Sequence, residues 1–147
     1  MHAAQFETAI EKIVADKNRY DPLAYYFLKD ALDFTLKRFK ENNEGPMRHV
    51  TGKELALGFR DLALQEFGPM AATLLSEWNV HTTRDIGEMV FHLIDQQMFG
   101  KQDSDTLEDF DGLYEFNEAF VKPFAPSRSN SNQTPSTTPK KSVAKGK

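Results

Sequence analysis

The stretch MRHVTGKE, residues 47–54, contains the residue types of a small anion site. Thr51 and Glu54 have the three-residue spacing of a capping box, which predicts that a helix begins just after Thr51. The first amides of a helix attract anions, and neighbouring cations strengthen the attraction. The candidate anion-binding residues are Arg48, His49, Thr51 and Lys53. The alternative, which we favour, is that Glu54 and nearby acids satisfy these groups within the chain.

A second candidate for contact with anions is the tail, residues 125–147. It is rich in Ser, Thr, Asn and Pro and nearly devoid of apolar residues, so we expect it to be disordered. Its basic residues are Arg128, Lys140, Lys141, Lys145 and Lys147. Flexible cations neutralise phosphates without recognising a nucleotide sequence. The tail is therefore a better electrostatic candidate for binding nucleic acid than the acidic helices of the domain. We favour a solubilising extension, or one that folds back on the acidic residues 102–121.

Residues 102–121 hold seven acidic residues and no basic one, interspersed with aromatic residues. In an EF-hand alignment the third, fifth and sixth positions are Asp109, Asp111 and Gly112. Glu118 then falls on the twelfth position, but Leu107 stands first, where an Asp is expected. We therefore expect no metal site here, and interpret the segment as an acidic stretch that its aromatic residues anchor to the domain.

Support for enzymatic chemistry is weaker. Glu88 and His92 are four residues apart on one predicted helix face, where a carboxylate can orient an imidazole, but no nucleophile or second histidine accompanies them. The chain has no Gly-rich phosphate loop, no His-Glu-x-x-His and no Gly-x-Ser-x-Gly. It also has no cysteine, which excludes thiol catalysis and thiolate metal sites. The sequence thus predicts no catalytic residue, no metal and no cofactor.

The elements that position these residues are predicted to be helices, because apolar residues recur at helical spacing almost throughout residues 1–124. The first helix includes residues 6–14. The second runs from Pro22, after Asp21, to about Lys40, and the third begins after Thr51. The fourth extends from Pro69 to about Trp78, because glycine and proline at 68 and 69 end the third. The fifth begins after Thr82, with Asp85 at capping-box spacing, and reaches about Phe99.

Apolar side chains indicate which faces of these helices are buried. For the second helix the expected buried residues are Tyr26, Phe27, Leu32, Phe34, Leu36 and Phe39. For the third they are Leu55, Phe59 and Leu62, with Phe67 as a further candidate, and for the fifth Ile86, Met89, Val90, Leu93 and Ile94. A sixth, short helix is expected near residues 114–121.

The fourth and fifth predicted helices have the order of a DNA-reading helix-turn-helix. The second helix of such a motif must present basic and amide side chains to DNA. Residues 82–97 instead carry Arg84 against Asp85, Glu88 and Asp95, a net charge of −2, which duplex phosphates repel. We therefore expect plain core packing at this corner.

The predicted fold is all-α: a compact bundle of five to six short helices in residues 1–124, with residues 102–121 packed on it and a disordered basic tail over 125–147. Residues 1–124 hold all 22 acidic residues and 13 basic ones, so their net charge is −9. No segment has the roughly 18 consecutive apolar residues of a membrane span, and the first residues do not resemble a signal peptide. We expect a soluble, cytoplasmic protein without membrane contact.

Several phrases of the sequence are similar to a known family. RHVTGKEL, FGPMA, a tryptophan followed by a capped helix with GEMVF, and a closing KPF resemble an uncharacterised family of small proteins found mainly in planctomycetes and verrucomicrobia. The resemblance covers most of residues 6–124 and not the tail. It implies a bacterial, cytosolic, mainly helical domain with a variable C-terminal extension, and no assigned activity or cofactor.

The leading functional hypothesis is a non-enzymatic helical binding or adaptor protein that acts through a macromolecular partner, a protein in preference to a nucleic acid. The first alternative is a nucleic-acid or ribosome-associated factor that uses the basic tail and the cations between Arg48 and Lys53. The second is an enzyme or small-ligand protein with an unrecognised pocket. No feature of the sequence sets an oligomeric state.

Overall fold

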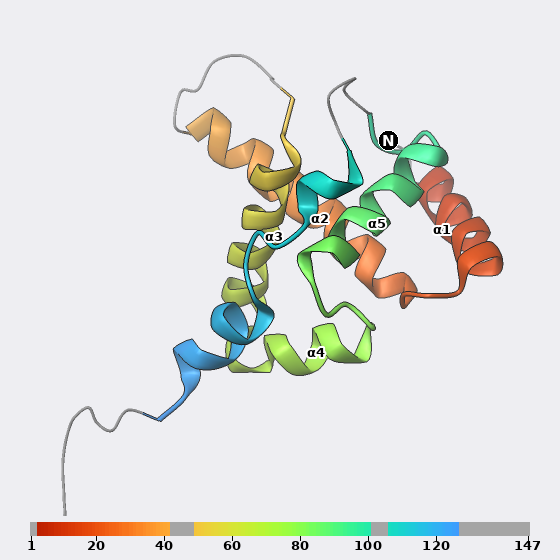
Figure 1. Cartoon of the computed structure of the whole chain (residues 1–147). Helices are drawn as coiled ribbons and strands as arrows, with labels where there is room; N and C mark the ends of the chain where they lie inside the picture. The colour runs from red at the N-terminus through yellow and green to blue at the C-terminus, as the bar shows by residue number, and fades with distance from the viewer. Residues whose placement is uncertain (1–2, 42–48, 101–105, 127–147) are drawn as a thin grey trace, which may run out of the picture.

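The computed structural model describes residues 3–41, 49–100 and 106–126, and these residues form helices and no strand (Figure 1). The α-helices are α1 (Ala3–Lys17), α2 (Pro22–Glu41), α3 (Gly52–Phe67), α4 (Ala71–Glu77) and α5 (Thr83–Asp95). Short helical turns are η1 (Gly68–Met70), η2 (Leu107–Phe110), η3 (Asn117–Val121) and η4 (Lys122–Phe124). The predicted all-α fold is confirmed. Within the described ranges, none of the helices combines the length and apolar character that crossing a membrane requires.

Local capping signals determine where α3 and α5 begin. The amide of Glu54 donates to Thr51 Oγ1 over 3.1 Å, and Glu54 Oε1 accepts from the amide of Thr51 at 3.0 Å. Thr82 and Asp85 form the same reciprocal pair at the start of α5. Each box satisfies two amides that a helix start leaves without an intrahelical partner. Both predicted helix starts are therefore confirmed.

The break between α3 and α4 lies where glycine and proline were expected to place it. Gly68 has a φ of +51°, a conformation that side chains disfavour, and its amide donates to the carbonyl of Leu64. The 3₁₀ turn η1 follows, so α4 begins at Ala71 rather than at Pro69.

Helix α5 lies at the centre of the molecule, in contact with α1, α2, α3 and η2 (Figure 1). Its buried residues are Thr83, Asp85, Ile86, Gly87, Met89, Val90 and Leu93. A helix that reads DNA has to expose the face that enters the groove. The burial of α5 therefore supports the interpretation of this corner as core packing.

The expected buried face of α2 was partly wrong. Phe27 is buried as predicted, but Tyr26 is exposed, and Leu32, Phe34, Leu36 and Phe39 are half-buried. The residues of α2 that are buried are Ala24, Tyr25, Phe27, Leu28, Ala31 and Thr35. The small residues Ala31 and Thr35 lie where α3 approaches closely: a methyl group on Gly58 would collide with the hydroxyl of Thr35.

The predicted end of the fifth helix was also wrong. Helix α5 stops at Asp95 instead of continuing to about Phe99. Gln97 has a φ of +62°, which reverses the chain and returns Phe99 to the core at 9 % exposure. The sequence analysis placed the end of the helix too late because apolar residues keep their helical spacing through this turn.

Residues 106–126 cross the bundle and are fixed to it by Phe110 and Phe120, which are 3 % and 1 % exposed. The π-helical turn η3 contacts α3, α4 and η1. The short helix expected near residues 114–121 is thus a single π-helical turn, Asn117–Val121. The hydroxyl of Tyr114 donates to the carbonyl of Ala56 over 2.8 Å, which ties this segment to α3.

Candidate functional site

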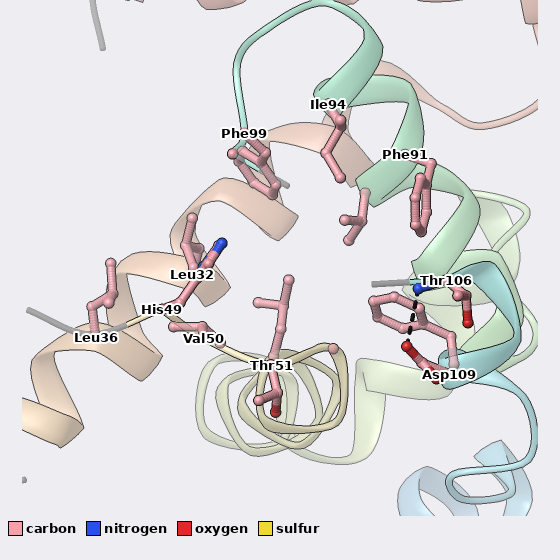
Figure 2. Close-up of a pocket in the computed structure, with 15 residues that line it drawn as sticks. Leu32, Leu36, His49, Val50, Thr51, Phe91, Ile94, Phe99, Thr106 and Asp109 are labelled. Carbon is pink, nitrogen blue, oxygen red and sulfur yellow. Dashed lines mark hydrogen bonds between the residues drawn. The ribbon is translucent and has the colours of Figure 1, made fainter. Parts of the chain in front are cut away.

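A cavity of about 240 Å³ lies between α2, α5 and the beginning of α3. Figure 2 shows the side chains of the two helices on opposite sides of the space, with Phe99 closing one end. Its apolar lining consists of Leu32, Leu36, Val50, Leu55, Val90, Phe91, Ile94, Phe99 and Phe110. Because α2 and α5 are far apart in the sequence, only the tertiary fold brings these residues together.

The polar lining of the cavity consists of His49, Thr51, Thr106 and Asp109. These residues lie just before α3 and beside η2, and all four are exposed. Asp109 Oδ2 accepts the amide of Thr106 over 3.0 Å, so the carboxylate is held in place by its own turn (Figure 2). Such a distribution, apolar within and polar at the edge, suits a group that enters with its apolar part first.

Phe110 fixes the wall formed by η2. Its ring lies against Gly52 at the start of α3 and against Gly87 in α5, where added methyl groups would come within 2.8 Å and 2.6 Å of ring atoms. The buried Thr83 hydroxyl donates to the carbonyl of Phe110 over 2.5 Å and accepts the amide of Leu113 at 3.2 Å. The ring of Phe110 therefore holds η2 against both α3 and α5, because glycine at 52 and 87 leaves room for it.

The candidate anion-binding residues are only partly brought together. His49 and Thr51 both line the cavity, whereas Arg48 lies outside the described residues. Lys53 is exposed on the first turn of α3. The Thr51 hydroxyl accepts the amide of Glu54, in the internal arrangement that we favoured. The anion site stays a prediction.

The tail residues Arg128, Lys140, Lys141, Lys145 and Lys147 also lie outside the described residues. Their predicted contacts with nucleic acid or with the acidic segment remain predictions.

The acidic residues of the EF-hand alignment have other partners. Asp109 caps η2, and Asp111 forms a bidentate ion pair with Arg84, with Nη1 at 2.9 Å and 3.0 Å from its two oxygens. Across residues 3–41, 49–100 and 106–126, no three His, Asp or Glu side chains gather closely enough to hold a metal ion.

A polar cluster that the sequence analysis missed lies where Arg19 and Tyr20 meet α5. The Tyr20 hydroxyl lies 2.8 Å from Asp85 Oδ1 and 2.7 Å from Glu88 Oε1. Arg19 is 3.7 Å from Asp85 and 3.4 Å from Glu88, and so neutralises charge beside both carboxylates. Burial, followed by hydrogen bonds to Glu88 and Asp85, raises the pKa of Tyr20 above its usual value. The hydroxyl therefore stays protonated and tethers residues 19–20 to α5.

His92, four residues after Glu88 on α5, lies beside this cluster, with its ring centroid 6.3 Å from that of Tyr20. Its Nδ1 is 2.9 Å from the Tyr25 hydroxyl, and the neutral imidazole accepts that proton when Nε2 carries the hydrogen. Burial lowers the pKa of His92, and nearby Lys17 lowers it further. Glu88 accepts a hydrogen bond from Tyr20, so Glu88 and His92 each make a structural contact with a tyrosine. The sequence signal that could have pointed to these contacts is the group of tyrosines at and just before the start of α2.

Comparisons with protein families, with curated proteins and with solved structures gave no match for this chain.

Proposed function

We propose that this chain is a non-enzymatic binding protein and that the cavity between α2, α3 and α5 receives an apolar side chain of a macromolecular partner. The observation that carries the proposal is the cavity itself, with nine apolar residues within and four polar residues at its edge. Cavities of about 150 Å³ with apolar walls bind benzene. A space of about 240 Å³ accommodates a larger group, such as a tryptophan side chain.

The size of the energetic gain also fits an anchor residue. Burying an aromatic side chain removes about 150–250 Å² from water, which contributes ~4–6 kcal/mol before the costs of association. One side chain can therefore dominate the affinity of a small interface. A protein partner is favoured over a free small molecule because the polar groups that would orient such a molecule lie only at the edge of the cavity.

A peptide-display selection against the full chain tests this function. We expect selected peptides to share a large apolar residue and to lose at least tenfold in affinity with the variant Leu36→Trp, which fills the cavity from α2. Leu23→Trp is the matched control, because Leu23 is on the same helix, is 58 % exposed and does not line the cavity. Selected peptides that bind wild type and Leu36→Trp equally, with both variants folded, would refute the proposal.

A further inference from the structure

Among the described residues, the polar edge of the cavity consists of His49, Thr51, Thr106 and Asp109. The nearby Asp111 forms an ion pair with Arg84, whereas the carboxylate of Asp109 accepts a hydrogen bond from the uncharged amide of Thr106. Of the described residues that line the cavity, Asp109 carries the one carboxylate, and it lies at the edge where a group would enter.

We infer that the partner presents its apolar anchor with a basic residue beside it, so that the anchor fills the cavity while the cation lies against Asp109. This inference rests on the proposed function. Residues 1–124 carry a net charge of −9, which attracts a basic segment toward the domain before contact. The partner is therefore a protein with an exposed segment in which lysine or arginine flanks a large apolar side chain.

Three synthetic peptides separate the contribution of the apolar anchor from that of the flanking basic residue. Each is an acetylated, amidated Gly-X-Trp-X-Gly, in which X is lysine, glutamine or glutamate. They are titrated into the full chain at ~50 mM salt, and affinities are read from methyl shifts of Leu36, Val90 and Ile94. We expect the lysine peptide to bind about two- to fivefold more tightly than the glutamine peptide, the size of effect that one exposed ion pair supplies. The glutamate peptide should bind least.

Asp109→Asn should remove the advantage of the lysine peptide, because the amide oxygen still caps η2 but carries no charge. Glu115→Gln is the matched control: it removes an exposed carboxylate from the same segment at a residue that does not line the cavity. The advantage should also shrink at ~500 mM salt, where exposed charges are screened.

The outcomes distinguish this inference from the proposed function. Equal binding of all three peptides would overturn the basic flank and leave the apolar cavity as the site. Tighter binding of the glutamate peptide would overturn it in favour of the anion site predicted at Arg48, His49, Thr51 and Lys53. If a synthetic peptide of residues 127–147 displaced the lysine peptide from the cavity, the chain's own tail would be the basic segment and the separate partner would be refuted. Absence of binding by every peptide would contradict the proposed function itself.

Discussion

Single aromatic residues account for much of the core, and Phe59 is the clearest case. Its side chain is fully buried, and its ring meets Phe27 edge to face at a centroid distance of 5.0 Å. We expect Phe59→Ala to lower the free energy of unfolding by ~3–5 kcal/mol, because it removes buried surface and leaves a cavity. Urea denaturation measures the change. A difference near zero would mean that this ring does not lie in the core.

His92 should make stability depend on pH in a defined direction. Burial, and then Lys17, lowers its pKa in the folded chain below the ordinary value of 6.5. The unfolded chain then binds more protons than the folded chain as the pH falls through 6.5. The contribution of His92 to the free energy of unfolding should therefore fall on acidification from pH 7.5 toward its lowered pKa and level off below that pKa.

The control for this prediction is His92→Asn, whose side-chain oxygen can still accept the hydrogen bond from Tyr25. We expect its stability, measured by urea denaturation at each pH, to decline less on acidification than that of wild type. Parallel curves for the two proteins would show that His92 is not responsible.

At the scale of elements, the contact of α5 with η2 depends on the absence of a side chain at Gly87. A methyl group there would lie 2.6 Å from the ring of Phe110. Alanine favours helix over glycine by ~1 kcal/mol, but overpacking a filled contact costs about 1–3 kcal/mol. We expect Gly87→Ala to destabilise the protein.

A double-mutant cycle with Phe110→Leu tests the cause of this effect, because the smaller side chain leaves room for the methyl group. The cost of Gly87→Ala should fall in that background when unfolding free energies are compared. An unchanged cost would place the strain elsewhere.

Capping residues made the starts of α3 and α5 predictable, since Thr51 with Glu54 and Thr82 with Asp85 are local in sequence. The buried face of α2 could not be predicted in this way, because it depends on which other helix packs against it. Tyr26 is more apolar than Thr35, yet Thr35 is buried because α3 approaches at Gly58. The cavity could not be predicted for the same reason: its walls come from three helices and a reversed turn, whose juxtaposition no spacing in the sequence encodes.

Across the whole molecule, the separation of charge gives a further prediction. Residues 125–147 carry five basic residues against the net −9 of residues 1–124. If the tail binds nucleic acid, the full chain should be retained on immobilised RNA or DNA at ~50 mM salt, and deletion of residues 125–147 should abolish retention. Failure of the full chain to be retained would remove this alternative function.

The position of Phe110 connects the cavity with the stability of the entire domain. Its ring lines the cavity and also packs against α3 at Gly52 and α5 at Gly87. An occupant that packs on this ring stabilises the folded arrangement of η2, and that arrangement in turn favours the occupant by the same free energy. Ligand affinity and the stability of η2 against local unfolding are therefore reciprocal quantities, so that binding should slow amide hydrogen exchange in η2.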